Sequence, residues 1–170
     1  LWDLMHRVTI IGVTGYIGSG KSYLCKSVAS TNTNFVHVSV DEIIGCALGQ
    51  GGDLTHQALR VFGSELVLHA NTLMRHTGYD LDSNSLSARV RIDKAKLRQA
   101  YFDKRKSGLS KVWDNITYDY VIGKVVAKVL DIAAARSDQV ILLECAMASF
   151  FERLSHECTV QLSQVLSVVR

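Results

Sequence analysis

Gly15-Tyr-Ile-Gly-Ser-Gly-Lys-Ser22 carries more structural information than any other segment of this 170-residue sequence. It matches G-x-x-x-x-G-K-[ST], a glycine-rich turn whose backbone N–H groups surround phosphate oxygens. The apolar, β-branched run at residues 8–14 predicts a buried parallel strand before it. Residues 21–30 follow with the apolar spacing of a helix. Strand, turn and helix are the context that this motif requires, so we interpret residues 15–22 as a phosphate-binding loop (P-loop).

The P-loop pattern predicts a role for most of its residues. Lys21 would reach the β- and γ-phosphates of ATP and stabilise charge during transfer, and the Ser22 hydroxyl would ligate Mg²⁺. ATP and Mg²⁺ are therefore the expected cofactors. The residues predicted to contact the nucleotide are Gly15, Gly18, Ser19, Gly20, Lys21, Ser22 and Tyr23. The alternative interpretation is an ordinary glycine-rich turn that carries an exposed lysine.

The rest of the chain alternates strand-like and helix-like segments. Candidate strands follow at 34–40, 139–143 and 158–162, and candidate helices at 42–48, 55–68, 92–107 and 110–136. This alternation predicts an α/β fold with a parallel sheet, a three-layer architecture like that of P-loop NTPases. We expect one domain over 5–170, with a core at 5–52 and 137–170 and a helical acceptor-binding subdomain at 53–136. The polar segment 69–90 is expected to be a long excursion.

Two acids follow candidate strands, where ligands of parallel sheets bind. Asp41 comes after the second strand and is a candidate catalytic base for an acceptor hydroxyl. It could instead cap the next helix, or Ser39-x-x-Glu42 could form a capping box there. Glu144 ends the third strand and is a candidate Mg²⁺ ligand together with Ser22. A helix cap or an ion-pair partner is an equal alternative for Glu144.

The composition limits the classes of protein to which this chain could belong. The net charge of +3 is too mild to indicate a nucleic-acid partner, and no apolar run is long enough for a membrane span. Four scattered cysteines suit reduced thiols in the cytoplasm, and neither they nor the six histidines have zinc-site spacing. Nine of the nineteen Lys and Arg residues lie within 89–111. That run is either a solvated helix face or a surface that attracts a phosphorylated substrate.

Several segments, in order, resemble the dephospho-CoA kinase family. Val13-Thr-Gly-Tyr-Ile-Gly-Ser-Gly-Lys-Ser22 resembles its TGGIGSGKS opening, and Val40-Asp-Glu-Ile43 its D-A-D-x-I segment. The later matches are Val61-Phe-Gly-Ser-Glu-Leu66 to F-G-x-x-[IL], Ile92-Asp-Lys-Ala-Lys-Leu-Arg98 with Phe102 to L-D-R-x-x-L-R…F, and Leu143-Glu-Cys-Ala-Met147 to L-D-x-P-L. The resemblance implies phosphorylation of the ribose 3′-hydroxyl of dephospho-CoA. It implies Asp41 as the base and Lys94 and Arg98 as acceptor-binding residues.

The sequence also departs from this family. Tyr16 replaces the second loop glycine and is expected to crowd the phosphates, Ser39 replaces the first aspartate, and Ala146 replaces a proline. The family's usual His-Pro becomes Tyr118-Asp119, and its C-terminal lid is expected to be missing from this sequence. Two alternatives therefore stay open. One is a P-loop kinase for another small acceptor, such as a nucleoside monophosphate, and the other is a nucleotide-binding protein without turnover.

Overall fold

A computed structural model describes residues 8–68, 90–103, 107–136, 138–158 and 162–169. The chain divides into two compact units, one formed by residues up to 43 and from 120 onward, and the other by residues 44–119. We call the first the sheet unit and the second the helical unit. The divisions fall inside helices α3 (Val40–Ala47) and α7 (Ser107–Ala135), whereas the sequence placed the subdomain boundaries at 53 and 136.

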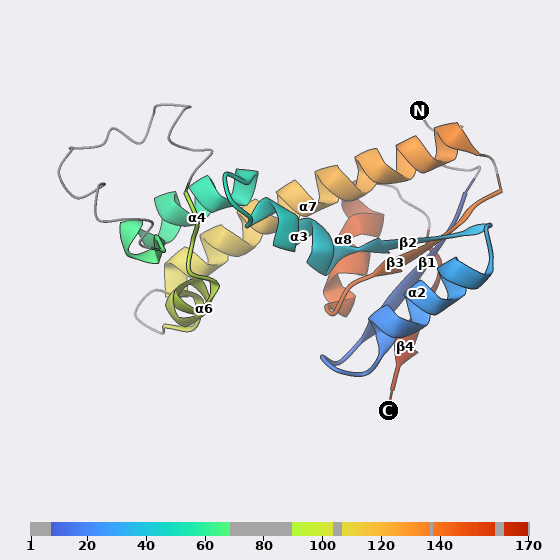
Figure 1. Cartoon of the computed structure of the whole chain (residues 1–170), viewed down its shortest axis with the longest axis horizontal. Helices are drawn as coiled ribbons and strands as arrows, with labels where there is room; N and C mark the ends of the chain where they lie inside the picture. The colour runs from blue at the N-terminus through green and yellow to red at the C-terminus, as the bar shows by residue number, and fades with distance from the viewer. Residues whose placement is uncertain (1–7, 69–89, 104–106, 137, 159–161, 170) are drawn as a thin grey trace. The chain divides into compact units, whose positions relative to one another are not determined.

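The sheet unit is built on four parallel strands (Figure 1). They are β1 (Thr9–Gly15), β2 (Phe35–Ser39), β3 (Val140–Glu144) and β4 (Leu162–Val168), in the spatial order β2-β3-β1-β4. The first crossover, from β1 through α2 (Lys21–Thr31) to β2, thus skips the position that β3 later fills. The fold is α/β with a parallel sheet, as predicted.

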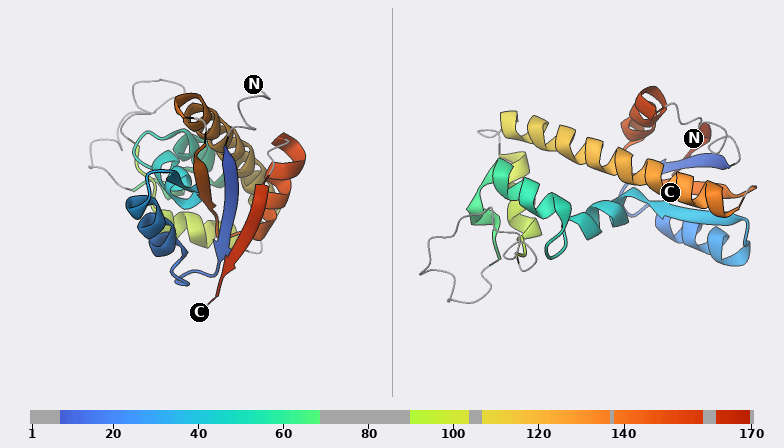
Figure 2. Two further views of the ribbon diagram at one scale, coloured as in Figure 1. Left: turned by 90° about the vertical axis from the view of Figure 1, so that its right-hand side faces the viewer. Right: turned by 90° about the horizontal axis from the view of Figure 1, so that it is seen from above.

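Helices cover both faces of this sheet, which makes three layers. Ile11 and Val13 of β1 pack with Cys25 of α2. Gly12, which faces the opposite side because side chains alternate along a strand, lies against Phe151 of α8 (Ala148–Cys158). A Cβ at Gly12 would lie only 3.1 Å from that ring. The left view of Figure 2 shows the sheet between α2 and α8.

The predicted fourth strand at 158–162 is wrong. Cys158 ends helix α8, and the strand is β4. The buried side chains of Phe150, Phe151 and Leu154 recur at helical spacing and pack α8 on the sheet. β4 pairs only with β1 among the described strands and is largely exposed, so it lacks the continuous apolar run that marked the central strands.

The helical unit packs around a small core. It contains α4 (Asp53–Phe62), the short 3₁₀ turn η1 (Ser64–Leu66), α6 (Lys94–Phe102) and the first part of α7. Phe62 and Trp113 meet edge to face, with ring centroids 5.9 Å apart. Val67 and Ile92 form an antiparallel bridge. The buried apolar residues of this unit include Leu54, Ala58, Leu59, Phe62, Leu66, Ile92, Leu97 and Trp113.

Several predicted helix boundaries need correction. The helix predicted over 55–68 ends at Phe62 because Gly63 has a φ of 101°. The helix predicted over 92–107 is α6, which begins after its cap, Asp93, and ends at Phe102. α3 and α7 begin at Val40 and Ser107, earlier than expected. The predicted excursion at 69–90 lies almost entirely outside the described residues. In the described ranges, no helix combines the length and apolar character needed to cross a membrane.

Candidate nucleotide-binding site

The P-loop joins β1 to α2 as a turn that depends on glycine. Gly20 adopts the left-handed conformation, with φ 92°, immediately before the first residue of α2. No side chain caps this helix end, and its first turn contains no acid, so its N–H groups remain available to an anion. Gly15 approaches the backbone of β4 so closely that a Cβ would lie 2.6 Å from the Val168 carbonyl oxygen. The loop thus has the form predicted for a phosphate cradle.

Lys21 is a buried cation with no counter-ion in the part of the chain that the structure describes. Only 6% of the residue is exposed, and its Nζ donates to the Tyr16 carbonyl oxygen at 3.4 Å. It makes no ion pair with any carboxylate in the described part of the chain. Beside it in the loop, the buried Ser19 Oγ also finds no hydrogen-bond partner among the described residues. Burying a cation without a counter-ion, or a hydroxyl without a hydrogen-bond partner, costs free energy. An anionic ligand would supply both, so this loop suits such a ligand.

The expected crowding by Tyr16 is not observed. The Tyr16 residue is 84% exposed, so its side chain extends into solvent. No atom lies within 4 Å of a Cβ built at Gly18, the next glycine of the loop. Ile17 and Tyr23 are exposed as well. The space beside Gly18 and Gly20 is therefore open to a ligand.

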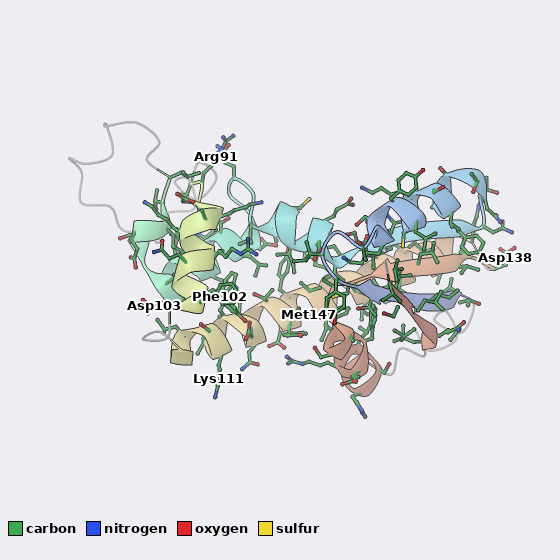
Figure 3. All side chains as sticks on the ribbon, turned by 90° about the horizontal axis from the view of Figure 1, so that it is seen from below. Arg91, Phe102, Asp103, Lys111, Asp138 and Met147 are labelled. Carbon is green, nitrogen blue, oxygen red and sulfur yellow. The ribbon has the colours of Figure 1, made fainter. Side chains whose placement is uncertain are left out.

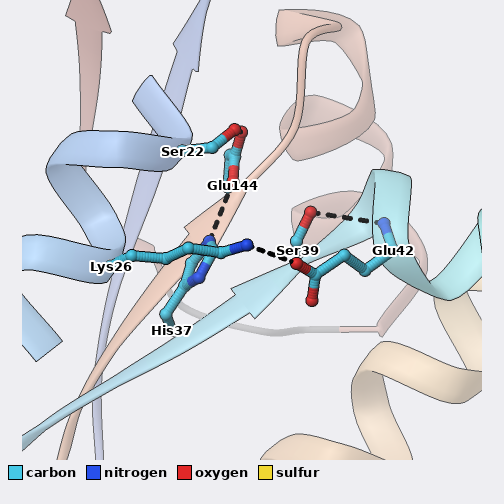
Figure 4. A network of polar contacts seen from close by, with 6 residues as sticks. All are labelled: Ser22, Lys26, His37, Ser39, Glu42 and Glu144. Carbon is cyan, nitrogen blue, oxygen red and sulfur yellow. Dashed lines mark hydrogen bonds and ion pairs between the residues drawn. The ribbon is translucent and has the colours of Figure 1, made fainter. Parts of the chain in front are cut away.

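Three polar side chains, one each from α2, β2 and β3, meet on one face of the sheet (Figure 4). Ser22 Oγ donates a hydrogen bond to Glu144 Oε1, and His37 Nε2 lies 2.8 Å from Glu144 Oε2. Glu144 is only 1% exposed, and each of its two carboxylate oxygens has a partner within the sheet unit. The predicted pair of Ser22 and Glu144 is thus in contact.

The strand register explains this meeting. Glu144 lies opposite Val13 of β1 on one side and Ser39 of β2 on the other. The P-loop follows β1 directly, so the carboxyl end of β3 lies beside it. Because β3 fills the position between β1 and β2, its last residue, Glu144, comes within hydrogen-bond distance of Ser22 in the first turn of α2. Strand order is what makes Glu144 a partner of Ser22.

The donor set at this edge suits Mg²⁺. A serine hydroxyl and a carboxylate are hard oxygen ligands, and nucleotide phosphates and water would supply the remainder. The described residues contain no group of three or more His, Cys, Asp or Glu side chains that could hold a metal by themselves. The site therefore fits a cation that arrives with a phosphorylated ligand.

Asp41 lies in the first turn of α3, two residues beyond β2, and is exposed. It is not the helix cap, because Ser39 Oγ accepts the Glu42 N–H at 3.3 Å in that role. Glu42 instead pairs with Lys26 at 2.8 Å, and this hydrogen bond lowers the pKa of Glu42. Burial raises the pKa of Cys145 to about 11, with a contribution from the negative charge of Asp41. The charge of the Asp41 carboxylate thus helps to raise the pKa of Cys145, the residue that follows Glu144.

The buried thiols of the sheet unit are poor nucleophiles. Burial raises the pKa of Cys25 to about 11, and the nearby charge of Glu144 adds to the effect. Cys145 has a similarly raised pKa. Both side chains are therefore protonated near neutral pH, and the chemistry of this edge belongs to its oxygen and nitrogen groups.

Lys94 and Arg98 belong to the helical unit, whereas the other predicted site residues belong to the sheet unit. Both are exposed and occupy positions four residues apart on α6, so they share one face of that helix. Arg91 and Lys111, two more members of the basic run, also extend into solvent (Figure 3). Both interpretations of the run, a solvated face or a surface for an acidic substrate, are consistent with this exposure.

His37 is the site residue that sequence reasoning missed. It stands between two valines in a short strand, where a lone histidine indicates nothing by itself. Its role depends on the pairing of Ser39 with Glu144. Because His37 is two residues before Ser39, its side chain lies on the same face of the sheet as Glu144, in a diagonal position. That pairing needs the order of the strands, which the sequence pattern does not provide.

Comparison with known proteins supports the fold. No protein-family profile matches the chain, and no curated protein matches its sequence. Among solved structures, a dephospho-CoA kinase from Campylobacter jejuni is similar, with a TM-score of 0.51 and 12% sequence identity. The match covers 96% of this chain and 90% of that kinase. At this identity the likeness concerns the fold alone, which is an α/β architecture with a parallel sheet.

Proposed function

We propose that this chain is an ATP-dependent phosphotransferase that phosphorylates the ribose 3′-hydroxyl of dephospho-CoA. The observation that carries the proposal is the P-loop itself, in which buried Lys21 has no counter-ion among the described residues and Ser22 contacts Glu144. The ordered sequence resemblance and the fold shared with a dephospho-CoA kinase support the choice of acceptor. The free thiols Cys25, Cys46 and Cys145 are consistent with a cytoplasmic location.

The phosphate site follows from the loop geometry. The uncapped N–H groups at the start of α2 would bind phosphate oxygens, and Ser19 Oγ would donate to one of them. Lys21 would stabilise the charge that develops on the transferred group. Ser22 and Glu144 would hold Mg²⁺, which when bound neutralises phosphate charge and orients the phosphates. All of these groups belong to the sheet unit.

The proposed binding and activation of the acceptor depend on fewer residues than the proposed phosphate site. Asp41 is an exposed carboxylate at the sheet edge that carries Glu144, where it would accept the proton of the acceptor hydroxyl. Lys94 and Arg98, exposed on one face of α6, would contribute positive charge to acidic groups of the acceptor. The helical unit as a whole is the proposed acceptor-binding part of the molecule.

The reaction can be tested with a panel of acceptors. We expect ATP and Mg²⁺ with dephospho-CoA to give a product heavier by one phosphoryl group, identified by mass as CoA. Nucleoside monophosphates in parallel reactions should remain unchanged. A phosphorylated nucleotide without CoA would indicate a kinase for another acceptor. ATP binding without transfer to any acceptor would indicate a nucleotide-binding protein without turnover.

A further inference from the structure

Glu144 is an acid whose two oxygens face different partners. Its Oε1 accepts from Ser22, and its Oε2 lies 2.8 Å from His37 Nε2. A carboxylate can only accept hydrogen bonds, so His37 Nε2 is the donor in the second contact. The exposed fractions of the two side chains are 1% for Glu144 and 9% for His37, so water has little access to this bond.

Two lysines of the sheet unit that could act as donors have other partners. Lys26, the lysine drawn in Figure 4, is bound to Glu42 at 2.8 Å. Lys21 turns its Nζ toward the Tyr16 carbonyl oxygen. Leu142, which pairs with His37 across the sheet, is apolar. Without the imidazole, Glu144 Oε2 would therefore be a buried carboxylate oxygen with no donor, and the carboxyl group would rotate or reorient to find one.

We propose that His37 is a positioning residue of the P-loop site. It holds Glu144 so that Oε1 faces Ser22. Glu144 Oε1 and Ser22 Oγ then form a preorganised pair of ligands for a divalent cation. This inference rests on the proposed function, because it concerns the cation that accompanies ATP. Partners of a metal ligand fix its orientation in this way, and their loss commonly weakens metal affinity.

The test compares two substitutions of similar size. His37→Gln keeps an N–H donor, whereas His37→Leu removes it. His156→Ala, at an exposed position near the end of α8, is the control for loss of a histidine in the same unit. Far-UV circular dichroism checks the fold of each variant. Mn²⁺ is the probe, with its affinity measured by electron paramagnetic resonance in saturating ADP, and ADP affinity is measured separately in EDTA.

We expect His37→Leu to weaken Mn²⁺ binding by roughly tenfold or more, while ADP affinity in EDTA stays unchanged. His37→Gln should restore Mn²⁺ affinity to within about threefold of the unsubstituted protein, because it supplies the donor again. The His156→Ala variant should match the unsubstituted protein in both measurements. Recovery with Gln distinguishes positioning through a hydrogen bond from a merely structural role.

Three results would overturn the inference. The first is a His37→Leu protein that binds Mn²⁺ as tightly as the unsubstituted chain. The second is a His37→Gln protein as impaired as the His37→Leu protein. The third is an equal loss of ADP affinity in EDTA, which would indicate damage to the loop. Failure of the unsubstituted chain to bind ADP with Mn²⁺ would instead contradict the proposed function, and the inference with it.

Discussion

Asp41 and Glu144 are acids at neighbouring strand ends with very different surroundings. Glu144 is buried and accepts hydrogen bonds from Ser22 and His37, which fix its orientation. Asp41 is exposed in the first turn of α3, where its carboxylate is open to an incoming group. A fixed, buried acid suits cation binding, and an accessible one suits proton transfer. We therefore propose separate roles for the two residues.

The role of Asp41 can be tested by removing its charge. Asp41→Asn should lower the turnover of ATP with dephospho-CoA by roughly a hundredfold or more, because a general base is lost. ATP affinity should not change, since the phosphate cradle lies in the P-loop. Glu42→Gln is the matched control, because Glu42 is the next residue and pairs with Lys26 instead. Near-normal turnover by the Asp41→Asn protein would refute the assignment.

Individual residues of the site were predictable to unequal degrees. The P-loop residues could be identified because their spacing is fixed by the phosphates they surround. The structure brings Ser22 and Glu144 into contact, and their role in Mg²⁺ binding stays a prediction. His37 could not be predicted, because its partner is 107 positions away in the sequence and depends on strand register.

Elements were predicted best where their pattern is continuous. β1 and β3 have largely buried apolar runs, β2 has apolar residues that are partly buried, and α2 follows the loop motif directly. α8 was missed and β4 misplaced, because an edge strand with exposed residues resembles a loop in composition. Helix ends depended on single residues, with Gly63 stopping α4 and Asp93 starting α6. Such local signals are weaker than a repeated apolar period.

The capping of α6 gives a prediction at this scale. Asp93 accepts hydrogen bonds from the backbone N–H groups of Ala95 and Lys96, at 2.9 and 3.2 Å. Asp93→Ala should lower the free energy of unfolding by about 1 kcal/mol, measured by urea denaturation. Asp93→Asn retains a capping oxygen and should lose little. An Asp93→Ala protein with an unchanged midpoint and slope would show that this cap contributes nothing to stability.

At the scale of the molecule, the α/β class followed from alternating segments, but the order β2-β3-β1-β4 did not. That order places Glu144 between Ser39 and Val13, and so beside the P-loop. The candidate site thus lies at the carboxyl end of the strands, within the sheet unit. The helical unit separately carries the basic helix α6, whose role in acceptor binding remains a proposal.

The central claim is that residues 15–22 bind the phosphates of ATP, and calorimetric titration of the protein with ATP and Mg²⁺ tests it most directly. Lys21→Ala should weaken binding by roughly tenfold or more, because a charged hydrogen-bond donor is removed from a buried site. Lys26→Ala, five residues along in α2, removes an exposed lysine paired with Glu42 and should stay within about twofold of the unsubstituted protein. Equal affinity of the Lys21→Ala and unsubstituted proteins, or no ATP binding by either, would contradict the claim.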